Sequence, residues 1–284
     1  MDAIATIILP TQDAVDVYDW DGLVEAINNT YTNMKLVVDI LRDIDMNEPP
    51  YNEGITQGIK TGSSAEVTIN GNGHKLKNVF VIRTTSSGST PYRVFNCGGS
   101  SDTYRLNIVN WDISCLAEGR YAYFAYGRVF FSNCDIQVKV HGSNVNNSAV
   151  GFYRCGVTIE GQGDGNYNQF NTGESYYADE SNFLINGKFD SLYIQWLRNS
   201  YVSGDFESIQ GASHFVVSNN YLGVLNASIK STRTPTFGSL TSFAVNTETW
   251  TGPDWDTIEK NGLIKCTTAD LQSQQTMNGL DFPV

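Results

Sequence analysis

The sequence has few basic residues and few charged residues of any kind. Lysine and arginine number 18 against 30 aspartates and glutamates, so the formal net charge is −12. Because nucleic acids and anionic membranes attract cationic surfaces, this balance excludes both as expected partners. The charged share of 17% is also too low for a coiled coil or a charged disordered tail.

Long apolar segments are also absent from the sequence. No run approaches the ~20 residues that a membrane-spanning helix needs. The first 15 residues have no basic start, and the apolar run at residues 4–9 is shorter than the ~7–15-residue core of a secretory signal. We therefore expect that a signal has been trimmed from the chain or that the protein leaves its cell by another route.

Cysteine is scarce and odd in number. The five residues form no CxxC pair, which argues against a zinc ribbon and a thioredoxin-like site. We expect reduced thiols that are buried and inert, since a redox site would need exposure and a lowered pKa. They are Cys97, Cys115, Cys134, Cys155 and Cys266.

What the sequence does contain is a series of short β-type segments separated by Gly, Asn and Ser, from about residue 34 to residue 245. Five segments share a pattern, and their matched apolar positions are separated by 23, 21, 45 and 20 residues. The 45 corresponds to two repeats. A period of ~20–25 residues is typical of a solenoid coil and predicts about nine or ten coils. The matched positions are Ile113, Ile136, Val157, Val202 and Leu222.

In such a solenoid, equivalent residues of neighbouring coils stack ~4.8 Å apart. The repeat therefore predicts an inward asparagine ladder at one corner, formed by Asn110, Asn133, Asn199 and Asn219 and interrupted by Arg154. The cysteines at 115, 134 and 155 suggest a second register, with spacings of 19 and 21. The sequence leaves open which register applies at residues 111–115.

Two polar stretches interrupt the repeat, at residues 161–182 and 231–239. We interpret both as loops that project from the solenoid, where this architecture carries specificity. Within the first, residues 163–166 (Gly-Asp-Gly-Asn) have the composition of a calcium loop, although no closing glutamate follows at the right spacing. Calcium is the one cofactor that the sequence suggests.

The two ends differ in composition from the repeats. Residues 1–19 read as an N-terminal arm, residues 20–250 as the solenoid with its cap helix, and residues 251–284 as a C-terminal docking extension. At residues 20–29, apolar side chains recur at helical spacing, and Asp19 or Asp21 is placed to cap a helix that covers the open end of the solenoid. A second short helix is predicted at residues 268–275, with Thr268 as its cap.

One stretch suggests a known fold. Residues 66–76, EVTINGNGHKL, form a strand, a sharp turn and a second strand, and they follow a short helix and the strands at residues 36–40 and 42–45. This order resembles the N-terminal start of pectate-lyase-like right-handed parallel β-helices. The resemblance implies an all-β fold, a right-handed single-stranded parallel β-helix with a short N-terminal cap helix. It does not name a reaction.

The catalytic patterns of pectinases are incomplete in this chain. His141-Gly142 and Asn246-Thr247-Glu248 are present, but the paired Asp-Asp, Arg-Ile-Lys and Trp-Ile-Asp-His patterns are not. We interpret His74, His141 and His214 as structural. Asp205 and Glu207 flank Phe206, so on a strand both point to one face, and they are the candidate catalytic carboxylate pair, with Asp190 or Asp179 as a facing partner.

Aromatic clusters are the stronger functional signal. Exposed aromatic rings stack on the apolar faces of sugars and also anchor contacts between subunits. The candidate ligand-binding residues are Tyr123, Tyr126, Tyr176, Tyr177, Tyr193 and Trp196.

The sequence as a whole resembles the β-helical surface proteins of bacteriophage particles, such as tailspikes, appendages and head spikes. That resemblance implies a homotrimer on the virion surface, which contacts other virion proteins through its terminal arms and binds a host-surface polysaccharide or receptor. One alternative is a polysaccharide depolymerase, a glycoside hydrolase or lyase acting on capsule or cell-wall glycan. A further alternative is a bacterial surface adhesin module.

Overall fold

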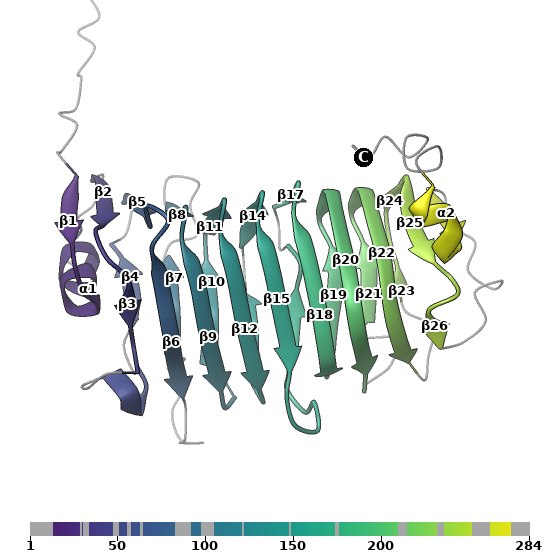
Figure 1. The fold of residues 1–284 in the computed structure, drawn as a ribbon, viewed down its shortest axis with the longest axis horizontal. Helices are drawn as coiled ribbons and strands as arrows, with labels where there is room; N and C mark the ends of the chain where they lie inside the picture. The colour runs from purple at the N-terminus through teal and green to yellow at the C-terminus, as the bar shows by residue number, and fades with distance from the viewer. Residues whose placement is uncertain are drawn as a thin grey trace, which may run out of the picture.

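The computed structural model of this chain is a parallel β-solenoid of about nine turns with two short helices, which confirms the predicted fold class. Figure 1 shows the coils stacked in chain order along the long axis, from the N-terminal end in purple to the C-terminal end in yellow. The structure describes residues 14–28, 30, 34–47, 51–55, 58–62, 65–82, 92–97, 105–120, 122–147, 149–173, 176–209, 215–231, 236–251 and 262–273.

The strands form two sheets, one of 19 strands and one of eight. The larger sheet contains β1 (Val15–Val17), β2 (Lys35–Ile40), β3 (Ile44–Asp45), β5 (Glu66–Asn70), β6 (Lys75–Ile82), β8 (Arg105–Val109), β9 (Asp112–Glu118), β11 (Val129–Ser132), β12 (Asp135–His141), β14 (Gly151–Tyr153), β15 (Gly156–Gly161), β17 (Ala178–Asp179), β18 (Asn182–Phe189), β20 (Leu197–Ser208), β22 (Asn220–Ser231), β24 (Leu240–Thr241), β25 (Phe243–Asn246), β26 (Trp250–Thr251) and β27 (Leu263–Cys266). The smaller sheet contains β4 (Ile59–Thr61), β7 (Tyr92–Cys97), β10 (Ala122–Gly127), β13 (Asn144–Asn147), β16 (Gln169–Asn171), β19 (Ser191–Gln195), β21 (Phe215–Ser218) and β23 (Thr236–Phe237). The helical elements are α1 (Trp20–Asn28), the 3-10 turn η1 (Tyr51–Glu53) and α2 (Thr268–Gln272).

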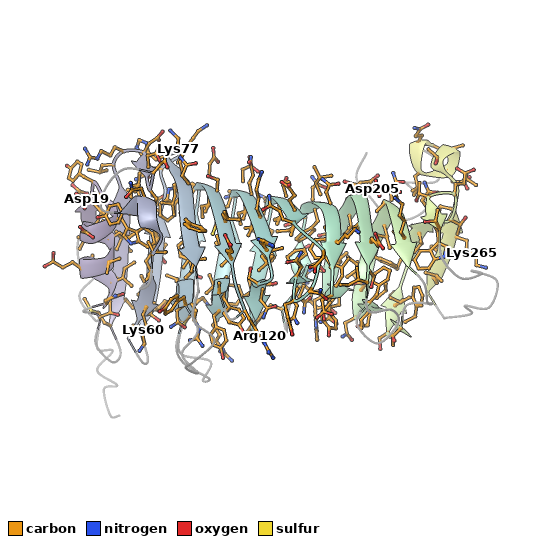
Figure 2. The ribbon with its side chains drawn as sticks, turned by 90° about the horizontal axis from the view of Figure 1, so that it is seen from below. Asp19, Lys60, Lys77, Arg120, Asp205 and Lys265 are labelled. Atoms are coloured by element: carbon orange, nitrogen blue, oxygen red, sulfur yellow. The ribbon has the colours of Figure 1, made fainter. Side chains whose placement is uncertain are left out.

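A corner divides the larger sheet into two faces. Its wide face contains β6, β9, β12, β15, β18 and the later residues of β20 and β22, and its narrow face contains β5, β8, β11, β14, β17 and the first residues of β20 and β22. The smaller sheet forms the third face. Figure 2 shows Lys77 and Asp205 of the wide face on the opposite side of the solenoid from Lys60 and Arg120.

The pairing of the strands confirms the register that stacks Ile113, Ile136 and Val157, and not the register that would stack Cys115 on Cys134. Ile113 pairs with Ile136, and Ile136 with Val157, whereas Cys115 lies opposite Val138 rather than a cysteine. Phe183 occupies the intervening coil between Val157 and Val202, so their spacing of 45 residues does span two coils. The last predicted member is wrong: Val202 pairs with Leu225, not with Leu222.

Residues in the left-handed conformation make the corner between the narrow and wide faces. Their φ angles lie between 48° and 54°, and the register stacks them in consecutive coils: Asn110, Asn133, Arg154, Glu180 and Asn199. The predicted inward asparagine ladder is therefore wrong, because this bend leaves the side chains of Asn110 and Asn133 exposed. Arg154 belongs to the column instead of interrupting it, and Asn219 lies at a different corner, beside Trp196.

Aromatic rings fill the centre of the solenoid. Phe131 stacks on Phe124 and on Phe152, each with ring centroids 5.5 Å apart, and Phe152 packs edge-on against Phe183 at 5.6 Å. All five cysteines are buried and free, as predicted, and burial raises the pKa of the Cys115 thiol. The thiol is therefore protonated and unreactive at neutral pH.

Helix α1 covers the N-terminal end of the core, as predicted. Trp20, Leu23 and Ile27 are buried, and the Asp19 carboxylate accepts a hydrogen bond from the backbone N–H of Gly22 at 2.8 Å, so Asp19 is the N-cap. Strand β1, inside the predicted arm, pairs in parallel with β2, and β27, inside the predicted extension, pairs with β25. The docking roles of the two ends stay predictions.

Helix α2 begins at Thr268, as predicted, but ends at Gln272 rather than at residue 275. Its cap is Thr267 rather than Thr268, because the Thr267 side chain accepts from the Asp270 backbone while the Asp270 carboxylate accepts from the Thr267 N–H. No helix in the described ranges is long and apolar enough to cross a membrane.

The polar stretch at residues 161–182 is a coil of the solenoid and not a projecting loop. It contains β16 and β17, and Asn168 and Thr172 are fully buried. The Asn168 amide donates to the carbonyls of Gln162 and Lys188, each at 2.9 Å, and its oxygen accepts from the N–H of Gly142 at 2.7 Å. These bonds satisfy the buried amide, so polar residues occupy interior positions here. Of the second stretch, Thr236 and Phe237 form β23, and residues 232–235 lie outside the described residues.

Candidate functional site

Exposed and half-buried aromatic side chains gather on the narrow face. The ring of Phe130 packs edge-on against Tyr176 with centroids 4.8 Å apart, and Tyr177 packs in the same way against Trp196 at 5.6 Å. The first pair joins β11 to the segment before β17, and the second joins that segment to the residue before β20. We call Phe130, Tyr176, Tyr177 and Trp196 the aromatic strip.

A glycine makes room for the strip. Gly151 lies opposite Phe130 in the next coil, and a Cβ atom at this position would lie 2.9 Å from Cδ1 of Phe130 and 3.5 Å from Cβ of Tyr176. Such a contact is closer than real Cβ atoms allow. The absence of a side chain at Gly151 therefore lets the two rings meet across it.

Trp196 has an unusual backbone conformation. Its φ is 59°, and the equivalent residue of the next coil, Asn219, has a φ of 55°. The fold thus requires a left-handed residue at this corner. Asn adopts this conformation readily, whereas a bulky residue adopts it only with strain. A Trp here is strained by about 1–2 kcal/mol, and strain of this kind points to a functional reason for the ring.

Arginines line the strip. The guanidinium carbon of Arg105 lies 5.1 Å from the ring centre of Phe130, that of Arg128 lies 5.9 Å from Tyr176, and that of Arg198 lies 5.5 Å from Tyr177. Contacts of this type attract a cation to the face of a ring. They leave the strip with hydrogen-bond donors beside each aromatic surface.

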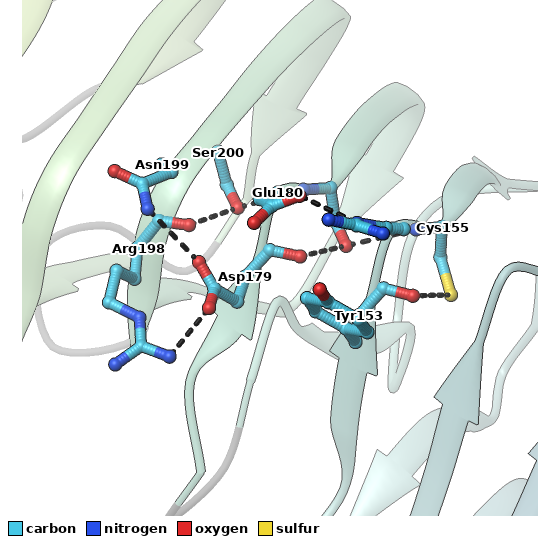
Figure 3. Close-up of polar contacts among 9 residues, drawn as sticks. Tyr153, Cys155, Asp179, Glu180, Arg198, Asn199 and Ser200 are labelled. Carbon is cyan, nitrogen blue, oxygen red and sulfur yellow. Dashed lines mark hydrogen bonds and ion pairs between the residues drawn. The ribbon is translucent and has the colours of Figure 1, made fainter. Parts of the chain in front are cut away.

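Carboxylates at the corner fix Arg198, whose contact with Asp179 is drawn in Figure 3, and one further arginine, Arg154. Arg198 forms an ion pair with Asp179, and Arg154 donates to Glu180 at 2.7 Å. Hydrogen bonding to these carboxylates raises the pKa of both guanidinium groups, so both stay charged. Asn199 also donates to Asp179, at 3.3 Å.

A buried serine ladder supports this corner. The hydroxyl of Ser200 donates to the carbonyl of Arg198 at 2.8 Å and accepts from the N–H of Ser181 at 3.1 Å. The hydroxyl of Ser181 in turn accepts from the N–H of Cys155 at 3.1 Å. Figure 3 shows Ser200 and Cys155 on different coils, with Asp179 and Glu180 between them. The site is therefore built on rigid backbone.

The structure brings three of the six predicted ligand-binding residues together: Tyr176, Tyr177 and Trp196. Tyr123 and Tyr126 lie on β10 of the smaller sheet, with ring centroids 5.6 Å apart, and Arg93 stacks on Tyr126 at 3.5 Å. Tyr123 is only 7% exposed, which rules out its ring as an open stacking surface. Tyr193 is half-buried on β19.

The candidate carboxylate pair lies on the wide face. Asp205 and Glu207 flank the buried Phe206 on β20, so both side chains are on the outer face. The register places Asn186 and Ser228 beside Asp205, and Lys188 and Lys230 beside Glu207, rather than the suggested partners Asp179 and Asp190. Lys188 Nζ lies 3.6 Å from the Glu207 carboxylate. Nothing in this arrangement supplies a second facing carboxylate.

The remaining residues singled out in the sequence are the three histidines and the turn suggested as a calcium loop. His74 Nδ1 lies 3.5 Å from Asp43, His141 Nδ1 lies 3.9 Å from Glu118, and His214 lies outside the described residues. In the part of the chain that the structure describes, no group of three or more His, Cys, Asp or Glu side chains is placed to hold a metal ion. The Asp164 carboxylate accepts from the backbone of Asn166 at 2.9 Å, and calcium binding by this turn stays a prediction.

Sequence reasoning missed Phe130 and the arginines of the strip. The signal that was available is the strand pattern of β11, where buried Phe131 requires that its neighbour Phe130 face outward. The arginine contacts join residues from different coils, so they become visible only once the register is known.

Comparison with known proteins gives one match. The sequence matches the family described as a pectate lyase-like adhesive domain, over residues 14–274. No curated protein and no solved structure matched the chain. The matched region includes every described strand and both helices.

Proposed function

Since the chain belongs to the pectate lyase-like adhesive domain family, we propose that it is a surface adhesion module whose aromatic strip binds glycans without cleaving them. The family match supports the surface adhesin alternative better than the virion spike. The virion location, the homotrimer and the terminal contacts with virion proteins stay predictions.

The single observation that carries the proposal is the strained, partly exposed Trp196 within a set of aromatic rings. Sugar rings present apolar C–H faces that stack on aromatic side chains, and their hydroxyls need hydrogen-bond partners close by. The strip offers both, with four rings and the guanidinium groups of Arg105, Arg128 and Arg198. Its position on stacked strands also limits the entropy lost on binding.

Charge indicates the kind of glycan. The protein is acidic overall, which by itself would repel an anionic polysaccharide. Around the strip, however, Arg105, Arg128, Arg154 and Arg198 stand against the carboxylates Asp179 and Glu180. This local excess of positive charge favours glycans with carboxylate or sulfate groups, and their binding is expected to weaken as salt rises.

The substitution Trp196→Asn separates binding from folding. Asparagine is the residue at the equivalent position of the next coil, so it relieves about 1–2 kcal/mol of backbone strain while losing a ring contact of about 0.5–1.5 kcal/mol. The free energy of unfolding, measured by denaturant titration, is therefore expected to change by less than about 1 kcal/mol. Glycan affinity, measured on an array of neutral and acidic glycans, is expected to fall about tenfold or more.

Tyr18→Ala is the matched control. Tyr18 is 53% exposed and lies at the N-terminal end, away from the strip, so its removal should leave the array pattern unchanged. Equal binding by wild type and Trp196→Asn would refute the strip as the glycan site. An array on which the wild-type chain binds no glycan would refute the proposed function itself.

A further inference from the structure

A hollow lies on the smaller sheet, apart from the aromatic strip. It has a volume of about 330 Å³ and is lined by Arg120, Tyr123, Asn144, Tyr167, Gln169 and Asp190, among others. Figure 2 shows Arg120 on the side of the solenoid opposite Asp205, so the hollow is remote from the wide face. Its lining comes from four successive coils, since Tyr123 pairs with Asn144, Asn144 with Gln169, and Gln169 with Ser191, the residue after Asp190. None of these residues belongs to the aromatic strip.

Two hydrogen-bond acceptors in this hollow lack donors. Asp190 is 9% exposed, and within the described residues its carboxylate has no hydrogen bond or ion pair. The side-chain oxygen Oδ1 of Asn144 is buried and likewise has no partner in the described part of the chain. The buried Asn144 oxygen has lost water and gained no donor in return, which is unfavourable, and the Asp190 carboxylate lines the hollow without a protein donor. The hollow is therefore incomplete without a ligand that donates hydrogen bonds.

The other walls define the shape of that ligand. Tyr167, which is 51% exposed, supplies aromatic surface, and the guanidinium carbon of Arg120 lies 4.9 Å from its ring centre. Tyr167 has a φ of 64°, a conformation that is unfavourable for an aromatic residue and that persists only where surrounding contacts impose it. The hollow thus combines an aromatic wall, one cation and two free acceptors in a space that fits a small ring.

The hollow is preformed. Buried Asn168 accepts from the N–H of Gly142 at 2.7 Å, and its backbone carbonyl accepts from the N–H of Asp190 at 2.9 Å. The hydroxyl of Ser143 donates to the carbonyl of Ala117 at 2.7 Å. Because these bonds join the coils behind the lining residues, the acceptors are held in place before any ligand arrives.

The geometry points to a pyranose-binding subsite in this hollow. One sugar residue would donate hydroxyl hydrogen bonds to the Asp190 carboxylate and to Asn144 Oδ1, and lie against Tyr167 while Arg120 or Gln169 donates to its remaining oxygens. The inference deepens the proposed function and rests on it, because it assigns a terminal or branch sugar of the same bound glycan to a second site.

The test uses the full chain and a panel of methyl pyranosides as probes, with binding measured by saturation-transfer NMR and titration calorimetry. The wild-type chain is expected to bind at least one of them. Asp190→Asn is expected to weaken that binding about tenfold or more, since it replaces a charged acceptor by a neutral amide. Its unfolding temperature should stay close to that of wild type, because the carboxylate lines the hollow and holds no other described side chain in place.

Asp135→Asn, at an exposed position of β12 on the wide face, is the matched control, and it should bind the pyranosides as wild type does. Trp196→Asn separates this inference from the proposed function, since it should lose polymeric glycan but retain the methyl pyranoside. Undiminished pyranoside binding by Asp190→Asn would overturn the subsite. So would a wild-type chain that binds polymeric glycan through the strip and binds none of the pyranosides.

Discussion

Replacing Phe131 with alanine is expected to lower the free energy of unfolding by about 3–5 kcal/mol. Phe131 is fully buried, stacks on Phe124 and Phe152 with ring centroids 5.5 Å apart, and meets Phe95 edge-on at 5.9 Å. Its strand pairs on both sides, with β8 and β14, so the backbone has little freedom to close around the cavity. The loss therefore includes the cavity as well as the lost burial.

Phe130→Ala is the neighbouring control for this prediction. Phe130 is on the same strand but faces outward and is only partly buried, so its removal should cost about 1 kcal/mol or less. Denaturant titration followed by far-UV circular dichroism measures both variants. Because a solenoid is stabilised by contacts between neighbouring coils, the Phe131 variant should also show a broader transition. Equal losses of stability for the two variants would contradict the assignment of Phe131 to the interior and of Phe130 to the outer face of β11.

The second large effect is expected at Gly127, at the end of β10. Its φ is 81°, and a Cβ atom there would lie 2.0 Å from the backbone carbonyl oxygen of Cys97 in the preceding coil. Gly127→Ala therefore combines left-handed strain with a clash between two backbones that cannot both stay in register. We expect a loss of about 3 kcal/mol or more in the free energy of unfolding.

Gly73→Ala separates the backbone strain from the clash between coils. Gly73 has a φ of 77°, close to that of Gly127, but a Cβ atom there would have no heavy atom within 4 Å. Only the strain remains, so the loss should be about 1–2 kcal/mol. The difference between the two variants, from the same denaturant titration, measures how tightly adjacent coils are packed. Variants of equal stability would mean that the coils at Gly127 can separate without cost.

The sequence predicted the solenoid because apolar residues recur at one position per coil. Ile113, Ile136 and Val157 stack as their spacing indicated. The 45-residue spacing indicated the coil that holds Phe183, but the polar residues before Phe183 were wrongly interpreted as a projecting loop. Asn168 occupies an interior position there, satisfied by three hydrogen bonds, two of which reach the neighbouring coils. A sequence shows which residues are polar but not the hydrogen-bond partner of each. A segment with buried amide side chains is therefore easily interpreted as a surface loop.

The corner was mispredicted for a related reason. Asn at a repeated position fits both an inward ladder and a left-handed bend, since asparagine is suited to either. The two readings differ at Arg154 and Glu180, which hold φ angles of 53° and 49° at equivalent positions. An arginine or a glutamate there is compatible with an outward bend and not with a buried amide ladder.

The candidate site was predicted only in its local parts. Tyr176, Tyr177 and Trp196 were identified as exposed aromatic residues, and they do contact one another or neighbouring rings. Their joining into one strip depends on Phe130, which is 46 residues before Tyr176 in the chain and reaches it because Gly151 leaves a gap between coils. Contacts between residues so far apart in the chain follow from the register of neighbouring strands, which the composition of the sequence does not specify.

One measurement tests the adhesive function most directly. A polysaccharide retained by the wild-type chain on the array would be incubated with the chain in solution, and its chain length, reducing ends and unsaturated products followed over time. The account predicts that the polysaccharide is bound with its length unchanged. Release of reducing ends or unsaturated products that disappears in Asp205→Asn or Glu207→Gln would contradict it, and would identify the protein as a depolymerase.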